Sequence, residues 1–394
     1  MPPKDIAIFA QSQDSHACAV DYVLRAMGHR PILFNTSERC NGAHFSVGYD
    51  DQAIHLRIGD FVGPLDRITS SWNRRVSKTS NLPDFTHPAD RSYVQDNAHS
   101  TLMGMLRLLD RRFAVNPIAT CRVHSNKLAQ LEAAAASGFR IPKTIISNKY
   151  EDIDDFLGRV GEACFKSYFA RGWLTDSGPV HAMTTRLRRG QNPDKEAYEL
   201  MPHIYQEFIP KKAEYRLTLF GLYAAAVKID TSRLDAAGVI DWRANPLYRN
   251  AMSHYELPAQ VVDAARKVMR ALGLRFGTFD IAETADGEFY FFEVNEEGQW
   301  LWVELSCPEA PLLQPFCEFL ASADDNFIWS ASRARADYNA DAICGIIDVE
   351  SSGIYKHIFD SVFPDSGSLA ADERNEVKPN HNPEYQPMVG SEAR

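Results

Sequence analysis

The pattern of hydrophobic and polar positions in the first 120 residues alternates between strands and helices. Residues 5–10 form a short apolar run that is typical of a buried strand, and a helical pattern from Ser15 to Met27 closes at Gly28. A second strand, predicted at 31–35, completes a strand–helix–strand unit. Further strands are expected at 53–58 and 67–75, and a helix at 90–112. This order predicts an α/β domain.

Turn and capping signals mark the start of a second domain near residue 122. Asn116-Pro117 is a turn signal, and Ser125 can cap a helix that Gly138 ends and that Pro142 prevents from resuming. The segment 164–173 then reads as a strand with Lys166 among apolar neighbours. Such a lysine usually faces solvent from a half-buried sheet.

A second group of strands follows. Residues 205–209 are predicted to form a strand that leads to Pro210, and a strand pair is expected around Phe220-Gly221. Because proline removes a donor from the ladder, we expect backbone groups at 208 and 209 to be free to bind something else. A helix from about Pro258 to Leu272 comes next.

The stretch from Arg275 to Trp302 has the pattern of a hairpin. Asp286-Gly287 lies between two runs rich in Phe, Tyr, Ile and Val, which predicts a two-residue loop. With that loop, Ala282 lies opposite Phe291, and Asp280 lies opposite Glu293. The register therefore places two carboxylates side by side.

Side-chain alternation adds Asn295 to the face of Glu293. It points four apolar residues the other way: Phe279, Ile281, Phe292 and Val294. Like charges on directly opposed residues are destabilising, so we expect a cation between the two acids. Two carboxylates and an amide oxygen suit Mg²⁺ better than Zn²⁺. The alternative is a solvated acidic face, but the uniformly apolar opposite face favours a metal site.

Composition narrows the class of protein. The 394 residues are long enough for two or three domains, and 45% of them are hydrophobic. The net charge of −10 argues against a nucleic-acid partner. The seven cysteines are scattered without a CxxC pair, which favours a reducing cytoplasm. No apolar run has the length of a membrane span or a signal peptide, so no membrane association is expected.

The sequence around the hairpin resembles the metal-binding end of the ATP-grasp superfamily. Its segments FGTFD, EVN and GQWLWVE are most similar to the ligases that mature ribosomal peptides of the microviridin or graspetide type. The resemblance implies ATP as cofactor and Mg²⁺ held by Asp280, Glu293 and Asn295. One departure is Glu296-Glu297, where the family commonly has Pro-Asn after EVN. No P-loop or Rossmann glycine motif occurs in the chain.

The same resemblance implies further site residues. Lys127 and Lys166 correspond to lysines that bind ATP phosphates, and Glu214 to the residue that holds the ribose. The hinge segment that reads adenine corresponds to Gln206, Glu207, Phe208 and Ile209. Catalytic or substrate-facing charges correspond to Arg216, Lys228, Arg243, Arg74 and Arg75. The alternative for each charged residue is a solvated surface position, although a lysine in the first turn of a helix, as at Lys127, is disfavoured without a nearby anion.

We therefore predict an α/β ATP-grasp architecture in four parts. They are an N-terminal open α/β domain (1–121), a central subdomain (122–204), a C-terminal subdomain with the hairpin (205–320) and a partly disordered extension (321–394). The implied reaction activates a carboxylate as an acyl phosphate and forms side-chain ester or amide cross-links in a precursor peptide. Two alternatives are a ligase that adds a free amino acid and a nucleotide-dependent binding protein without turnover. A homodimer is also possible.

Overall fold

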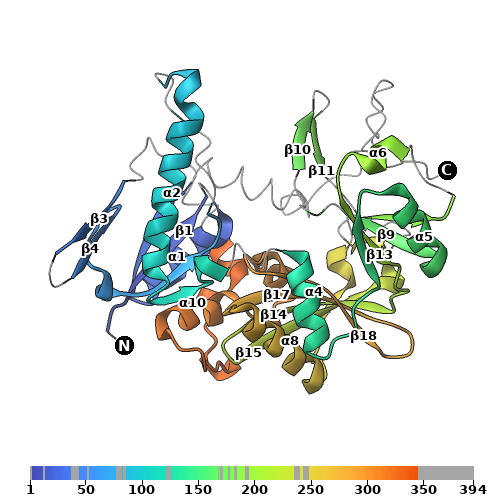
Figure 1. Ribbon diagram of the computed structural model, residues 1–394. Coiled ribbons are helices and arrows are strands. Elements are labelled where there is room, and N and C mark those ends of the chain that lie inside the picture. Colours follow the sequence, from blue (N-terminus) through green and yellow to red (C-terminus); the bar gives the residue numbers. More distant parts are fainter. Residues whose placement is uncertain are drawn as a thin grey trace.

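The computed structural model describes most of the chain up to residue 344 (Figure 1). The described residues are 2–11, 14–36, 44–50, 53–76, 82, 86–120, 126–166, 168, 172–175, 178–181, 184–190, 195–234, 240–242 and 248–344. Ser125, Arg243 and residues 345–394 of the extension predicted to be partly disordered lie outside them. Among the described residues, no helix combines the length and apolar character needed to cross a membrane.

The N-terminal part contains a parallel sheet in the strand order β2-β1-β6-β7. Its strands are β1 (Asp5–Ala10), β2 (Arg30–Asn35), β6 (Ile68–Asn73) and β7 (Phe113–Val115). The α1 helix (Ser15–Ala26) links β1 to β2, which confirms the predicted strand–helix–strand start. The long α2 helix (Arg91–Leu109) confirms the helix predicted at 90–112 and buries an apolar stripe that includes Leu102 and Leu106.

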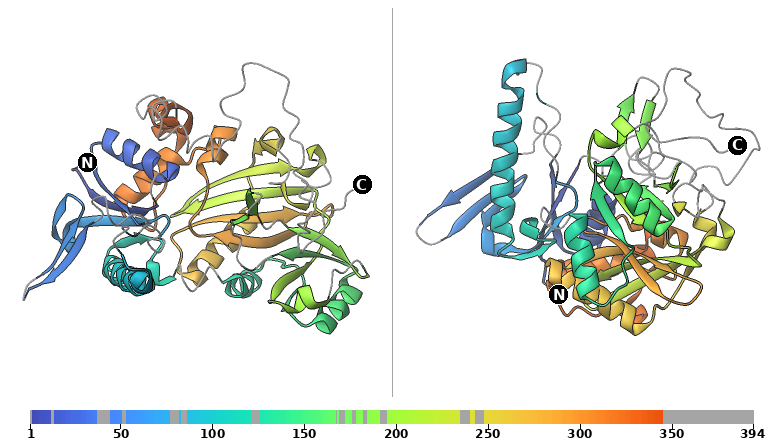
Figure 2. Two further views of the ribbon diagram at one scale, coloured as in Figure 1. Left: turned by 90° about the horizontal axis from the view of Figure 1, so that it is seen from above. Right: turned by 45° about the vertical axis from the view of Figure 1, so that its right-hand side comes forward.

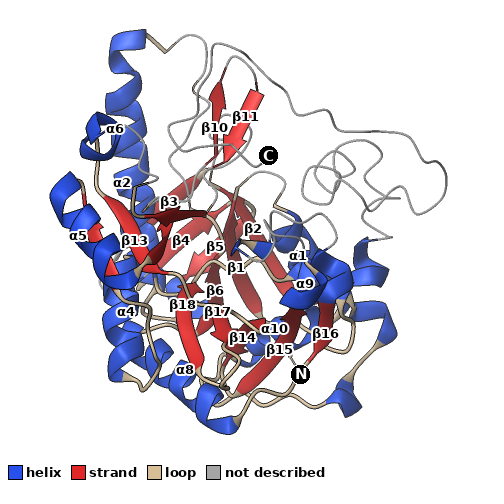
Figure 3. Ribbon diagram, turned by 90° about the vertical axis from the view of Figure 1, so that its right-hand side faces the viewer, coloured by secondary structure: helices blue, strands red, loops and turns tan. Residues whose placement is uncertain are grey.

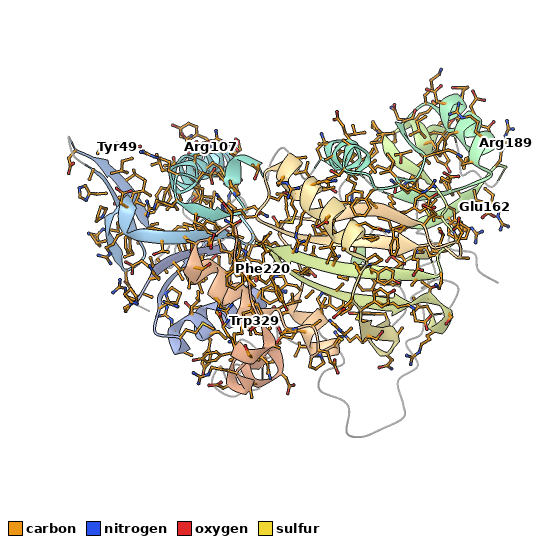
Figure 4. All side chains as sticks on the ribbon, turned by 90° about the horizontal axis from the view of Figure 1, so that it is seen from below. Tyr49, Arg107, Glu162, Arg189, Phe220 and Trp329 are labelled. Carbon is orange, nitrogen blue, oxygen red and sulfur yellow. The ribbon has the colours of Figure 1, made fainter. Side chains whose placement is uncertain are left out.

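A small antiparallel sheet is attached to this domain. It consists of β3 (Phe45–Tyr49), β4 (Ile54–Ile58) and β5 (Phe61–Pro64). Figure 4 labels Tyr49 at its outer tip, at the opposite end of the molecule from Glu162 and Arg189. The sequence analysis predicted only the middle strand of this sheet.

The central part is built on an antiparallel sheet in the order β12-β9-β13-β8. The strands are β8 (Thr144–Ser147), β9 (Glu162–Lys166), β12 (Thr185–Arg188) and β13 (His203–Glu207). Helices α5 (Tyr150–Val160) and α6 (Lys195–Glu199) and a hairpin of β10 (Gly172–Thr175) and β11 (Gly178–His181) complete it. The predicted boundary between residues 204 and 205 falls inside β13, which belongs wholly to this sheet.

The largest sheet is antiparallel and has the order β16-β15-β14-β17-β18. Its strands are β14 (Ala213–Phe220), β15 (Tyr223–Asp230), β16 (Met252–His254), β17 (Phe276–Glu283) and β18 (Phe289–Asn295). Helices α4 (Lys127–Ala136) and α8 (Ala259–Leu272) cover one face (Figure 2). Figure 3 shows the strands of the three larger sheets inside a shell of helices.

The C-terminal helices return to the N-terminal sheet. They are α9 (Leu301–Ser306) and α10 (Leu313–Ser322). Phe316 of α10 lies against Trp72 of β6 with ring centroids 4.9 Å apart, and Ser70 donates a hydrogen bond to the carbonyl of Leu320. The remaining short 3₁₀ turns are 65–67, 88–90, 231–233, 248–251, 331–333 and 336–338. The first and last parts of the described chain therefore share one core.

The hairpin of β17 and β18 differs from its prediction in two ways that offset each other. The loop has three residues instead of two, because the Gly287 N–H donates to the carbonyl of Thr284 and Gly287 has a φ of +81°. Ala282 consequently pairs with Tyr290, not with Phe291. A register shift between Asp280 and Ile281 restores the expected pairing of Asp280 with Glu293.

Asn116 fastens this hairpin to the N-terminal domain. Its side-chain oxygen accepts the N–H groups of Arg275 and Phe276 at 2.8 Å. Its side-chain nitrogen donates to the carbonyls of Phe276 and Glu296 at 2.8 and 2.9 Å. Because Asn116 is 1% exposed, one buried side chain holds the start of β17 and the end of β18 together.

We predict that Gly298→Ala destabilises the fold more than a matched glycine substitution. Gly298 has a φ of +55°, and an added Cβ would lie 2.4 Å from the Phe276 ring. Gly59 has nearly the same φ, +54°, but an added Cβ would meet nothing within 4 Å. Left-handed backbone strain of about 1 kcal/mol is common to both, and overpacking adds about 1–3 kcal/mol only at Gly298. Urea unfolding of both variants measures the difference, and equal losses would contradict the prediction.

Candidate active site

A cavity lies between the central sheet and the largest sheet. Many of the residues predicted for nucleotide and metal binding line it: Lys127, Lys166, Gln206, Glu207, Phe208, Ile209, Glu214, Asp280 and Glu293. These residues come from α4, β9, β13, β14, β17 and β18. The structure therefore brings together segments that are far apart in the sequence.

The two opposed acids are each paired with a cation from another element. Arg216 lies directly opposite Asp280 on β14, and its Nη1 donates to the two carboxylate oxygens at 2.7 and 2.8 Å. Lys127, the first residue of α4, forms an ion pair with Glu293. The anion expected beside this helical lysine is therefore Glu293, and Asn126 caps the helix by accepting the N–H of Leu128.

Asn295 completes the group. Its side-chain nitrogen lies 3.4 Å from Oδ2 of Asp280 and 3.3 Å from Oε1 of Glu293. The two carboxylates are hard oxygen donors that fit Mg²⁺, and Asn295 would add a third oxygen once its amide is turned so that the oxygen replaces the nitrogen that now faces them. The described residues contain no cluster of three or more His, Cys, Asp or Glu side chains placed to hold a metal. Phosphate and water oxygens would therefore have to complete a six-coordinate shell.

Lys166 and the remaining donor of Arg216 fit an anionic ligand. Lys166 lies at the end of β9 with its Nζ 5.0 Å from the centre of the Phe292 ring. Burial lowers the pKa of Lys166, and Glu293 opposes that shift. The Nε of Arg216 is buried without a hydrogen-bond partner. An orphan donor and a desolvated ammonium beside a cavity are suited to phosphate oxygens.

The hinge differs from its prediction. The N–H of Phe208 is not free, because it donates to the carbonyl of Glu162 at 3.0 Å. The N–H of Glu207 likewise donates to the carbonyl of Lys143 at 2.8 Å. Ile209 follows the end of β13, and no described group hydrogen-bonds its N–H. Only the later part of the predicted segment thus keeps a donor for a ligand.

Glu214 is buried beside the cavity with a lysine that the sequence analysis missed. Lys211 donates from Nζ to Oε1 of Glu214 at 2.6 Å and to the carbonyl of Ile240 at 3.1 Å. Burial raises the pKa of Glu214, and Lys211 opposes that shift. The ion pair with Lys211 therefore favours the charged form of Glu214, although its carboxylate is buried away from water.

Phe292 is the second residue that was missed. It was predicted to point into the core with Phe279, but the register shift in β18 sends it to the cavity and places Phe291 in the core instead. Lys166 and Lys211 both lie over its ring, at 5.0 and 5.8 Å from the centre. The sequence around Phe292 contains no recognisable signal for a β-bulge, so this orientation could not be predicted.

Lys228 is not brought to the site. It pairs with Tyr215 on β14, whereas Arg216 pairs with Val227. Neighbouring residues of a strand point to opposite faces, so Lys228 lies on the face away from Asp280, over the ring of Tyr255. Its assignment as a catalytic residue is therefore corrected. Arg243, in the DWR triplet, lies outside the described residues.

Arg74 is a buried structural residue instead of an accessible substrate contact. It is 1% exposed, lies 3.3 Å from Asp14 and donates to the carbonyl of Glu297 at 2.8 Å. His16 beside it accepts the N–H groups of Trp300 and Leu301 at 3.1 Å. This network holds the loop that follows the hairpin of β17 and β18, so Arg74 is not accessible to a substrate.

Arg75 differs from its neighbour. Its side chain is 32% exposed and makes only loose pairs, at 3.9 Å with Asp14 and 4.0 Å with Glu297. It lies just past the carboxyl end of β6, next to β1. Ligands of open parallel sheets bind in the crevice at this edge. Arg75 is therefore the accessible cation of the predicted pair.

Comparisons with known proteins identify the fold. No protein-family model and no curated protein matches the sequence. The macrocyclase MdnC from Microcystis aeruginosa MRC, bound with precursor peptide MdnA, is 24% identical with a TM-score of 0.69, over 81% of this chain and 100% of that chain. A Chryseobacterium gregarium RiPP-associated ATP-grasp ligase in complex with ADP and a leader and core peptide is 20% identical with a TM-score of 0.73, over 82% and 100%. Macrocyclase MdnB from Microcystis aeruginosa MRC is 22% identical with a TM-score of 0.65, over 83% and 100%.

This chain therefore has the ATP-grasp fold, which confirms the predicted α/β architecture. Within that fold, the solved structures that it matches over their whole length include peptide macrocyclases and a RiPP-associated ligase.

We predict that Arg74→Met and Arg75→Met have different effects on stability. Removing Arg74 leaves the buried Asp14 carboxylate and the Glu297 carbonyl without their partner, which should cost about 3 kcal/mol. Removing Arg75 breaks only loose, partly exposed pairs and should cost about 0–1 kcal/mol. Denaturant unfolding measures both variants. A loss at Arg75 as large as that at Arg74 would contradict the assignment of Arg74 as the structural residue.

Proposed function

We propose that the protein is an ADP-forming ATP-grasp ligase that cross-links side chains of a ribosomally made precursor peptide. The observation that carries the proposal is that Asp280, Glu293 and Lys127 line one cavity, while Arg216 and Asn295 contact the two acids from beside it. The reaction would transfer the γ-phosphate to a carboxylate, and the acyl phosphate would then be attacked by a hydroxyl or an amine.

The cavity offers a place for each part of ATP. The N–H of Ile209, to which no described group is hydrogen-bonded, would bind the adenine, and Glu214 in the wall would accept from the ribose. Lys127, Lys166 and Arg216 would bind the phosphates, where their charges offset charge that develops in transfer. Bound at Asp280, Glu293 and Asn295, Mg²⁺ would neutralise and orient phosphate oxygens.

A peptide substrate is supported by the nature of the matched structures. Several of them contain a precursor peptide or a leader and core peptide. In this chain, Arg75 provides an accessible cation near Glu297, in the loop that follows the hairpin, and it could hold an acidic side chain of such a peptide. The substrate would thus carry Asp or Glu side chains together with Ser, Thr or Lys side chains.

Other properties remain proposals. We place the boundary between the central and C-terminal subdomains after Glu207 and keep those at 121 and 320. The cytoplasm, where ATP and newly made peptides meet, is the proposed location, and the described cysteines are all free thiols. The homodimer stays a prediction, as does the absence of a nucleic-acid partner.

We predict that Asp280→Asn and Glu293→Gln each lower ADP formation by on the order of 100-fold or more, because each removes charge from the proposed Mg²⁺ site with little change in shape. Glu288→Gln is the control, since Glu288 lies on the same hairpin but pairs on the surface with Arg140. A coupled assay of ADP release with excess Mg²⁺ measures all three. Near-normal rates in both site variants would overturn the metal assignment.

We predict that the modified peptide is lighter than its precursor by whole multiples of the mass of water. Co-expression with a short Thr/Ser- and Glu/Asp-rich peptide encoded beside the gene, followed by intact-mass measurement, tests this. ADP and phosphate should form in step with the mass loss, and mild alkali should reverse it if the bonds are esters. A mass gain from an added amino acid, or AMP as the nucleotide product, would contradict the proposed function.

A further inference from the structure

Lys211 is buried at the wall of the cavity, and the proposed function assigns it neither phosphate nor metal binding. Its side chain is 5% exposed, and that of its partner Glu214 is 7% exposed. The ammonium donates to Oε1 of Glu214 and to the carbonyl of Ile240, and it lies 5.8 Å from the centre of the Phe292 ring. Three contacts from different segments therefore fix the position of this charge.

Glu214 is held by only one of its oxygens. Oε1 accepts from Lys211, whereas no described group donates to Oε2. Glu214 itself lines the cavity. A carboxylate fixed through one oxygen presents the other in a defined direction, and vicinal hydroxyl groups are suitable donors to it.

The environment explains why Glu214 needs a cation. Asp280 and Asp241 lie near enough to disfavour its negative charge, and burial does the same. A protonated Glu214 would be a weaker acceptor and could rotate to other partners. Lys211 is the cation that contacts Glu214 directly.

We propose that Lys211 is a positioning residue that holds Glu214 as an acceptor for a ribose hydroxyl and so makes the enzyme select ribonucleotides over deoxyribonucleotides. This inference rests on the proposed function, because it assumes that the cavity binds a nucleotide. Lys211 acts through Glu214, so its loss should reduce discrimination between sugars instead of removing phosphate binding.

The test compares ADP, 2′-deoxy-ADP and 3′-deoxy-ADP by calorimetry with Mg²⁺ and no peptide. We expect the wild-type protein to bind ADP roughly tenfold or more tightly than at least one deoxynucleotide, as for a hydrogen bond to a charged group. In Lys211→Met the preference should fall to about twofold or less. Lys211→Arg should restore part of it, and Lys211→Met combined with Glu214→Gln should be no worse than Glu214→Gln alone.

Lys212→Met is the matched control. Lys212 is the next residue, but its ammonium pairs with Glu283 and its side chain is 54% exposed. It should keep the wild-type preference. If Lys211→Met does not fold, Lys211→Gln, which is one atom shorter and uncharged, is compared in its place, and the preference should again fall because the charge beside Glu214 is lost.

The outcomes are distinguishable. A wild-type protein that binds no ADP at all overturns the proposed function and this inference with it. A wild-type preference that persists in the Lys211 variants, or an absence of preference in the wild type, overturns the role of Lys211 while nucleotide binding stands. Equal losses in the Lys211 and Lys212 variants would also overturn it, because they would indicate a general effect on the loop.

Discussion

Repulsion between two opposed carboxylates is the constraint around which this site is built. Asp280 and Glu293 face each other across adjacent strands, an arrangement that is unfavourable unless cations accompany it. Arg216 supplies one from the neighbouring strand, and Lys127 supplies the other from the first turn of α4. The two pairings fix the charge of the site and also attach α4 to the edge strand β18. The geometry of the candidate site and the packing of α4 therefore depend on the same contacts.

The N-terminal domain also holds the hairpin that carries the two carboxylates, together with the loop that follows it. Asn116 forms hydrogen bonds with both strands of the hairpin. His16 accepts the N–H groups of Trp300 and Leu301, where α9 begins. Burial and the neighbouring Arg74 lower the pKa of His16 well below its ordinary value, so the ring stays neutral and keeps its acceptor. The loop between Asn295 and Leu301 is thereby held at both ends by groups from the first 120 residues.

The sequence predicted the site better than it predicted the details of the strands. The fold class and the Asp280–Glu293 pairing were both right, although the loop length was wrong and the bulge that corrects it carries no recognisable signal. That bulge is why Phe292 was assigned to the core. The error at Lys228 was avoidable: pairing β14 with β15 around Gly221 and Leu222 places Arg216 and Lys228 on opposite faces. Lys211 could not be predicted as a site residue, because it lies in the loop between β13 and β14, where no helical or strand periodicity indicates the direction of a side chain.

The charge of the cavity makes its ligands interdependent. Among the described residues that line it, three are lysines (Lys127, Lys166 and Lys211) and five are acids (Glu207, Glu214, Asp241, Asp280 and Glu293). A polyphosphate that entered alone would meet more negative charge than positive. The lysine that pairs with Glu293 would also have to exchange a carboxylate for a phosphate. A divalent cation held by the carboxylates would remove both difficulties, because it would offset their charge and leave Lys127 available to the phosphates. Under the proposed function, nucleotide and Mg²⁺ would therefore bind as one unit, and the metal would replace the cations that Asp280 and Glu293 contact in this structure.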